Sequence, residues 1–250
     1  MLSQSAQGAM SAFHAVPATG CKVDHVAFRT SLQLACRLPL TILDGLTVCK
    51  CGAALDRHGD HVLSCSHVGD RTPWHDGIQD AVTRMCKCAG FHVSIDSRRP
   101  NRPYYSPHWK PDITCLNGSV AGTHLLVDVT TCSVVKPGTV GVAARMPLIV
   151  ADEAEADKLN RYGDVKPHVV LPFAVESSGA LGRSAAAFFK RCTKQAGDRL
   201  GPAELLRSTW SSASFASYFY QQLSMATLRG KGHFFQQAAL VLAGVGVNGG

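Results

Sequence analysis

Four residues between positions 49 and 65 have the types and the spacing of a zinc site. Two cysteines are separated by one residue. Nine residues then precede a histidine, and three further residues precede a third cysteine; the four residues are Cys49, Cys51, His61 and Cys65. Three thiolates and a histidine nitrogen can surround Zn²⁺ as a tetrahedron, and Gly52 and Gly59 permit the tight turns this needs. Three other histidines compete for the fourth position: His58, His67 and His75. The alternative is a cysteine-rich loop without a metal.

Two aspartates and a lysine form a second group that could do chemistry. Asp112 begins a short apolar segment, Asp128 lies inside the run Leu-Leu-Val-Asp-Val, and fifteen residues separate them. A carboxylate in so apolar a strand is costly to bury without a cation or partner, and paired strands would bring both carboxylates to one end of a sheet, where they could hold Mg²⁺. Lys158, with Tyr162 one turn further on the same helix face, would position the attacking water or neutralise charge at a phosphate. The alternative is that Asp112 caps a turn and Asp128 pairs with an arginine.

A proline-rich segment ahead of Asp112 interleaves cations with aromatic rings. Its basic residues are Arg98, Arg99, Arg102 and Lys110, and its ring-bearing residues are Tyr104, Tyr105, His108 and Trp109. Cations can contact phosphates while rings stack on unpaired or distorted bases, so the segment is a candidate DNA-binding loop. It reads equally well as a surface loop whose rings pack onto the core.

The composition fits a folded domain with a basic surface. Of 250 residues, 46% are apolar and 17% charged, which supports a sizeable core and excludes general disorder. The net charge of +7 permits a polyanionic partner such as nucleic acid. The longest strongly apolar stretch near an end, 238–247, is about half of a membrane span, so no membrane partner is expected, and the basic-free N-terminus argues against a secretory signal. Ten dispersed cysteines fit a metal site in a reducing compartment better than a disulfide framework.

Apolar periodicity predicts the elements that must position these groups. The expected helices are 23–40, 75–89, 148–162, 180–196, 203–227 and 234–242, and the expected strands are 91–95, 112–116, 124–135 and 168–175, with a hairpin turn at Asn117-Gly118. Residues 47–67 have too few apolar side chains for a core of their own and would need the metal to fold. The chain then divides into a loose tail (1–22), a short helix with the zinc knuckle (23–70), a core (71–178) and a helical C-terminal extension (179–250).

In combination and order, these motifs resemble one protein family. The segments CKCG, HGDHVLSC, PDIT, LLVDVT, ADEAEADKLNRY and LPFAVESSGALG, with Arg71 and His75 between the second and third, are similar to the C-terminal region of non-LTR retrotransposon proteins. That region carries a zinc knuckle and a restriction-like endonuclease of the PD-(D/E)XK superfamily. The resemblance covers roughly residues 30–200. It implies an α/β restriction-endonuclease-like core, which is a mixed central sheet flanked by helices, with an N-terminal zinc knuckle and a helical C-terminal extension.

The resemblance also assigns roles to individual residues. It gives the zinc ligands as Cys49, Cys51, His61 and Cys65. The PD aspartate falls on Asp112, the second acidic residue on Asp128, and the lysine, displaced from the strand position of Thr130 to the next helix, on Lys158. Asp96, ahead of the PD motif, and Glu176, after the last strand, are second-rank candidates. Lys110 stands where the family commonly has an arginine, a tolerable change for a phosphate contact.

The function implied by the resemblance is that of a DNA endonuclease dependent on Mg²⁺ or Mn²⁺. It would nick chromosomal target DNA in the nucleus, so that the freed 3′ hydroxyl primes reverse transcription by a separate protein segment on element RNA. No polymerase motif of the Phe/Tyr-x-Asp-Asp type occurs in these 250 residues, so the chain would correspond to the tail of such an element. The alternative is a catalytically inactive remnant that binds nucleic acid through the knuckle and the basic loop.

Overall fold

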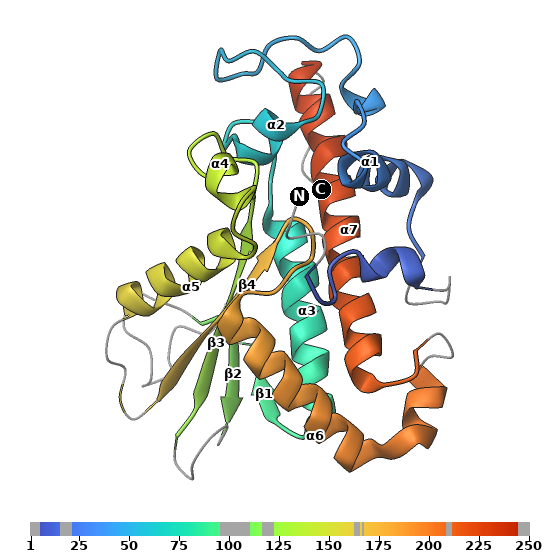
Figure 1. The fold of residues 1–250 in the computed structure, drawn as a ribbon, viewed down its shortest axis with the longest axis vertical. Coiled ribbons are helices and arrows are strands. Elements are labelled where there is room, and N and C mark those ends of the chain that lie inside the picture. The colour runs from blue at the N-terminus through green and yellow to red at the C-terminus, as the bar shows by residue number, and fades with distance from the viewer. Residues whose placement is uncertain are drawn as a thin grey trace.

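Helices surround one four-stranded sheet in the computed structural model, which describes residues 6–15, 22–95, 111–116, 123–162, 166, 168–208 and 212–244 (Figure 1). The N-terminal half contains η2 (Ser11–His14), α1 (His25–Ala35), η4 (Thr41–Leu43), α2 (Asp60–Ser64) and α3 (Thr72–Cys88). The strands are β1 (His92–Ser94), β2 (Ile113–Leu116), β3 (Leu125–Cys132) and β4 (Val169–Glu176). The remaining helices are α4 (Val140–Ala143), α5 (Ile149–Tyr162), α6 (Arg183–Ser208) and α7 (Phe215–Leu242).

The sheet is mixed, with the strand order β1-β2-β3-β4. β1 pairs with β2, and β2 with β3, in antiparallel fashion, whereas β3 and β4 are parallel from Leu125 opposite Val169 to Cys132 opposite Glu176. A parallel pair needs a crossover connection, and α4 and α5 lie on it. Most of β3 and β4 is buried because helices lie on both faces of this part of the sheet.

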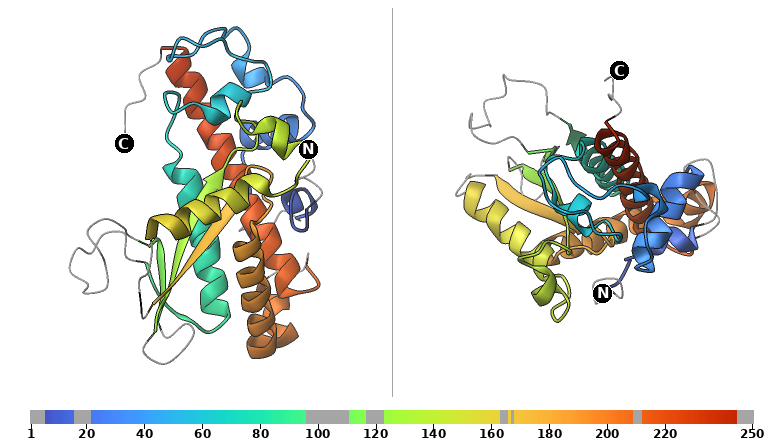
Figure 2. Two further views of the ribbon diagram at one scale, coloured as in Figure 1. Left: turned by 60° about the vertical axis from the view of Figure 1, so that its left-hand side comes forward. Right: turned by 90° about the horizontal axis from the view of Figure 1, so that it is seen from above.

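The sheet lies between α5 and α3 (Figures 1 and 2). α5 packs against β3 and β4, and α3 packs across β1, β2 and β3, while α6 packs against β4 and α3. The face of α3 toward the core carries the helical repeat expected from the sequence, and its buried members include Trp74, Ile78, Val82 and Met85. The long helix α7 then packs against α3, α1 and η2, so residues from both ends of the chain share one layer.

α7 runs without interruption where the sequence predicted two helices. The expected pair, 203–227 and 234–242, was wrong, since one helix extends from Phe215 to Leu242. Gly230 and Gly232 lie where α7 crosses other helices: a Cβ on Gly230 would meet Trp74 Cα at 2.6 Å, and one on Gly232 would meet Ala27 Cβ at 2.2 Å. Close packing between distant segments therefore outweighs the helix propensity that each glycine loses, about 1 kcal/mol.

The start of the expected helix 203–227 also differs. Residues 203–208 belong to α6, which is kinked at Gly201 (φ 71°, ψ 176°) just before Pro202. α7 begins after Ser214, whose hydroxyl accepts a hydrogen bond from the Ser217 N–H at 3.1 Å and caps the helix. Within the described ranges, no helix combines the length and the apolar character that crossing a bilayer requires.

The segment predicted to form the zinc knuckle, called the knuckle segment below, packs into the main hydrophobic core and does not form a core of its own. Leu40 and Val62 are fully buried in the same apolar cluster as Phe235 of α7 and Ile113 of β2. Gly59 approaches this cluster so closely that a Cβ would lie 2.6 Å from a Leu40 methyl, and its φ of 76° is in the left-handed region. The knuckle is therefore fastened to the rest of the fold by packing as well as by its own polar contacts.

Candidate functional site

The four residues expected to bind zinc lie together. The ligand atoms of Cys49, Cys51, His61 and Cys65 are all within 4.8 Å of one another. Cys49 Sγ lies 3.7 Å from Cys65 Sγ, and Cys51 Sγ lies 3.3 Å from His61 Nε2. Because Zn–S bonds are about 2.3 Å long, two thiolates at the corners of a tetrahedron stand about 3.8 Å apart. This cluster could therefore hold a metal such as zinc.

A tight turn presents the first two cysteines. The Cys49 N–H donates to the Ala53 carbonyl at 2.8 Å, and the Gly52 N–H donates back to the Cys49 carbonyl at 2.9 Å. Gly52 adopts the positive φ (85°) that this turn requires. The backbone N–H of Ala53 also lowers the pKa of the Cys51 thiol, which favours the thiolate that a metal binds.

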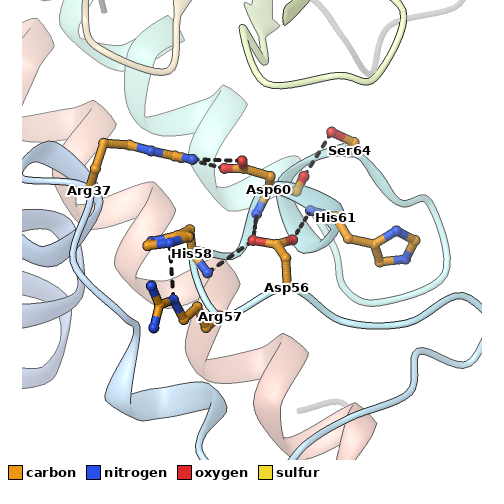
Figure 3. A network of polar contacts seen from close by, with 7 residues as sticks. All are labelled: Arg37, Asp56, Arg57, His58, Asp60, His61 and Ser64. Atoms are coloured by element: carbon orange, nitrogen blue, oxygen red, sulfur yellow. Dashed lines mark hydrogen bonds and ion pairs between the residues drawn. The ribbon is translucent and has the colours of Figure 1, made fainter.

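Asp56 holds the turn that leads to His61 (Figure 3). Its carboxylate accepts hydrogen bonds from the backbone N–H groups of His58, Asp60 and His61, at 2.9, 3.1 and 2.8 Å. Burial acts to raise the pKa of Asp56, but these donors outweigh it and the pKa is lowered. Asp60 in turn accepts two hydrogen bonds from the Arg37 guanidinium, at 2.5 and 2.8 Å, which ties α2 to the segment after α1.

The cluster contains His61 and none of the three competing histidines. His61 lies in the first turn of α2, and Cys65 directly follows the last residue of this short helix, so α2 sets the distance between the two side chains. The His58 ring instead lies 3.3 Å from Arg57 Nε, and His67 has only its backbone N–H near the Cys65 sulfur. His75 belongs to a different site on α3.

That second site begins with Asp112 and Asp128, which stand opposite each other. The β2–β3 register pairs Ile113 with Val127, and continuing it by one residue aligns the two aspartates. Directly opposed side chains of an antiparallel pair have their Cβ atoms about 4.5–5.5 Å apart. The hairpin turn expected at Asn117-Gly118 lies outside the described residues.

Asp128 is almost completely buried and is paired with Lys158. Lys158 Nζ lies 2.5 Å from Asp128 Oδ2. Tyr162, one turn along α5, also hydrogen-bonds to the Asp128 carboxylate, and Lys158 Nζ lies 5.9 Å from the centre of its ring. Burial raises the pKa of Asp128, and the hydrogen bonds from Lys158 and Tyr162 offset only part of that effect. The cationic partner of Asp128 is thus the lysine of α5, not an arginine.

Asp112 is held by β3 and by α3. Its Oδ2 accepts a hydrogen bond from the Val129 N–H at 2.7 Å and lies 3.2 Å from His75 Nε2. The Gln79 side-chain amide donates to the backbone carbonyl of Asp112 at 3.0 Å. The other ring nitrogen of His75 lies 3.2 Å from Asp76 Oδ1. The hydrogen bond with Asp112 is the largest cause that raises the pKa of His75 to about 9, despite the opposing effect of burial.

These groups line one open pocket of about 350 Å³. Its walls include Asp112 and Asp128 from the two strands, Thr130 from β3, Lys158 from α5, and Arg71 and His75 at the start of α3. The carboxylates could ligate a divalent cation through oxygen, and the flanking cations favour a negatively charged ligand such as a phosphate. Metal-assisted hydrolysis of a phosphodiester is chemistry that such a set of groups can perform.

Arg71 joins this pocket to the knuckle. Its Nη2 donates to the backbone carbonyls of Leu63 and Cys65, at 2.8 and 3.1 Å, and its guanidinium lies 5.3 Å from the centre of the Phe234 ring. Burial lowers the pKa of Arg71, with the Cys65 thiol as the opposing influence. Arg71 therefore contacts a residue of the Cys/His cluster and a ring of α7, and it lines the edge of the acidic pocket.

The other expected site residues lie elsewhere or outside the described part of the chain. Glu176 is completely buried at the end of β4, opposite Cys132, and is not among the residues that line the pocket. The candidate catalytic residue Asp96 and the whole candidate DNA-binding loop lie outside the described residues, in the range 96–110; the loop's basic residues are Arg98, Arg99, Arg102 and Lys110, and its ring-bearing residues are Tyr104, Tyr105, His108 and Trp109.

The sequence did not single out Gln79 as a site residue, nor His75 as a partner of Asp112. Arg71, His75 and Gln79 are four residues apart along α3, and this spacing places them on one helix face. That spacing was the sequence signal that could have placed Gln79 beside His75.

Neither a scan against protein-family models nor a search of curated proteins finds a match for the chain.

Proposed function

We propose that the protein is a metal-dependent DNA endonuclease that hydrolyses phosphodiester bonds, with an active site in the pocket between β2, β3, α3 and α5. The observation that carries this proposal is the convergence of Asp112, Asp128 and Lys158 on one pocket. Their types and chain order agree with those of the PD-(D/E)XK nucleases that the sequence resembles. The mixed sheet with helices on both faces is compatible with a restriction-endonuclease-like core.

In this proposal each polar group of the pocket has a distinct task. The Asp112 and Asp128 carboxylates would hold Mg²⁺ or Mn²⁺, and the metal would supply Lewis acidity to the reaction. Lys158 Nζ, which forms an ion pair with Asp128 and lines the same pocket, would contact the phosphate or the attacking water. Thr130, which stands where the family has its strand lysine, lines the pocket without supplying a charge.

The knuckle has a structural task in this proposal. Zinc at Cys49, Cys51, His61 and Cys65 would cross-link a segment that has little apolar surface of its own. Because Arg71 donates to the Cys65 carbonyl, a fixed cluster would also hold Arg71 in place at the edge of the pocket. The basic segment with Arg98, Arg99, Arg102 and Lys110 would hold chromosomal DNA in the nucleus, and the net charge of +7 supports this partner. Priming of reverse transcription on element RNA by a separate segment is proposed from the resemblance alone.

The deciding experiment is nicking of supercoiled plasmid by the zinc-loaded full chain, with Mg²⁺ or Mn²⁺. Asp112→Asn and Lys158→Ala should each lower the nicking rate by at least about 100-fold. Asp157→Asn is the matched control, because Asp157 is an exposed carboxylate next to Lys158 and does not line the pocket. Equal nicking by all four proteins would exclude this pocket as the active site.

The rival function is nucleic-acid binding without catalysis. One observation favours it: each carboxylate is already paired with a cation of the protein, Asp112 with His75 and Asp128 with Lys158. A binding remnant would shift DNA in chelator, keep that affinity in Asp112→Asn, and fail to nick with either metal. An endonuclease would nick, and the same variant would bind DNA without cutting it.

A further inference from the structure

The two oxygens of the Asp112 carboxylate have different environments. The Val129 N–H and His75 Nε2 both meet Oδ2, at 2.7 and 3.2 Å, whereas Oδ1 receives no hydrogen bond from any described residue. The aspartate side chain is one-fifth exposed and lines the pocket. The protein thus occupies one oxygen and leaves the other available to the pocket.

A carboxylate needs such contacts to keep one orientation. The terminal torsion of aspartate is broad and roughly two-fold, so a single hydrogen bond leaves the group free to rock about it. Asp112 also precedes β2, so the strand does not fix its side chain. A second contact from a different element, His75 of α3, removes that freedom because α3 is packed across the sheet.

The His75 ring has a carboxylate at each nitrogen: Nδ1 lies 3.2 Å from Asp76 Oδ1, and Nε2 lies 3.2 Å from Asp112 Oδ2. Gln79, one turn along α3, donates to the Asp112 backbone carbonyl at 3.0 Å and so fixes Asp112 against the same helix. Trp74 and Ile78, which flank this face, are buried in the core. The imidazole therefore has a defined place and direction in the pocket wall, and both of its nitrogens face carboxylates.

We propose that His75 is a positioning residue for Asp112: it holds Oδ2 so that Oδ1 is presented to the divalent cation. This inference rests on the proposed function, since it assigns a role around the same metal. Residues that orient a ligating side chain typically change metal affinity by about 10- to 100-fold when they are removed. His75 is not part of the Cys/His cluster and lines the acidic pocket, which agrees with this role.

The test is direct Mn²⁺ binding by the zinc-loaded full chain, followed through the electron paramagnetic resonance signal of free Mn²⁺. Asp112→Asn gives the background from weaker sites. His75→Ala should raise the Mn²⁺ dissociation constant by about 10- to 100-fold, and His75→Gln, whose amide can still donate to Oδ2, should recover most of the affinity. His67→Ala is the matched control, because its side chain contributes neither to the cluster nor to the pocket.

Plasmid nicking at several Mn²⁺ concentrations separates positioning from chemistry. In His75→Ala the metal concentration for half-maximal nicking should rise by the same factor as the dissociation constant, while the rate at saturating Mn²⁺ stays within about threefold. Zinc content and the thermal midpoint, measured on each variant, exclude a folding defect as the cause.

Three kinds of result would overturn the inference, and they can be distinguished. Wild-type affinity for Mn²⁺ in His75→Ala, or a loss of saturating rate without weaker metal binding, would show that His75 does not act by orienting Asp112. Absence of Mn²⁺ binding above the Asp112→Asn background in the wild type would overturn the proposed metal site itself. His75→Gln that behaves like His75→Ala would exclude the hydrogen bond to Oδ2 as the means of positioning.

Discussion

Lys158 Nζ and Asp128 Oδ2 lie 2.5 Å apart, and the aspartate of this ion pair is almost completely buried. Two buried charges offset each other, but one left alone in the core is strongly destabilising. Lys158→Met should therefore lower the free energy of unfolding by up to roughly 3–5 kcal/mol, less whatever relief the partly exposed pocket gives. Urea denaturation of zinc-loaded protein at pH 7, without divalent metal, measures the loss.

The double variant tests the cause of that loss. Adding Asp128→Asn to Lys158→Met removes the uncompensated carboxylate, so it should restore most of the lost stability although it deletes a second polar contact. If the stability loss of the double variant equals the sum of the losses of the two single variants, the two charges do not interact, and packing alone holds this part of the pocket together.

Zinc removal should destabilise the whole chain, because the knuckle shares the main core. We expect one tightly bound zinc per chain in the wild type and a strong reduction in Cys51→Ser, measured by elemental analysis after dialysis. Cys36→Ser is the control, since Cys36 is an exposed thiol outside the cluster. A chelator should lower the thermal midpoint of the wild type and of Cys36→Ser, and leave that of Cys51→Ser unchanged. Equal zinc content in both variants would contradict the assignment.

Arg71 should matter for stability even where zinc is retained. Arg71→Ala removes the donor of two hydrogen bonds to the Leu63 and Cys65 carbonyls and the contact with the Phe234 ring. Hydrogen bonds from charged groups contribute roughly 1.5–3 kcal/mol, so we expect a loss of that order in urea denaturation. Arg84→Ala, on an exposed position of the same helix, should change stability by less than about 0.5 kcal/mol. Similar losses in both would mean that the knuckle is not anchored through Arg71.

The elements around the two sites could be predicted because they depend on local patterns. Apolar repeats indicated α3 and α5, β-branched runs indicated β3 and β4, and the thiol spacing indicated the cluster that Cys49 and His61 share. The chain order of Asp112 and Asp128 was enough to predict that strand pairing would bring the two aspartates together.

What the sequence could not indicate depends on contacts between distant segments. The four-residue spacing along α3 places His75 on one helix face with Gln79. It does not identify Asp112 as the partner of His75, because that contact depends on how α3 lies across the sheet. Likewise, the helix-breaking tendency of Gly230 and Gly232 is a local property, while the crossings with Trp74 and Ala27 that require them are not.

The close crossing at Gly230 predicts that alanine will have opposite effects on stability at two helical glycines, Gly230 of α7 and Gly197 of α6. Gly230→Ala should destabilise the protein by about 1–3 kcal/mol, because its Cβ would lie 2.6 Å from Trp74 Cα, and backbone must shift to accommodate it. Gly197→Ala in α6 is the matched control: its Cβ would meet nothing nearer than 4.0 Å, so the better helix propensity of alanine should stabilise the chain by up to about 1 kcal/mol. Thermal unfolding of both variants measures these effects. If alanine stabilises the protein at both positions, α7 lies further from α3 than described.

Lys231 gives stability a pH dependence. It is almost completely buried on α7, where Nζ donates to the Ser177 carbonyl at 2.6 Å, and burial lowers its pKa from 10.5 to about 8. Between these two values the unfolded chain binds the proton and the folded chain does not, so the contribution of Lys231 to the free energy of unfolding rises as pH increases through this window.

The difference in stability between the wild type and Lys231→Met isolates this effect from other titrating groups. Between pH 7.5 and pH 10.5 the free energy of unfolding of the wild type should rise relative to that of Lys231→Met by an amount on the order of 3 kcal/mol. Lys190→Met, at an exposed position of α6, should give a difference that stays flat over the same range. Urea denaturation at each pH measures both. A flat difference for Lys231→Met would mean that the ammonium keeps its ordinary pKa in the fold, with water reaching it beside Ser177.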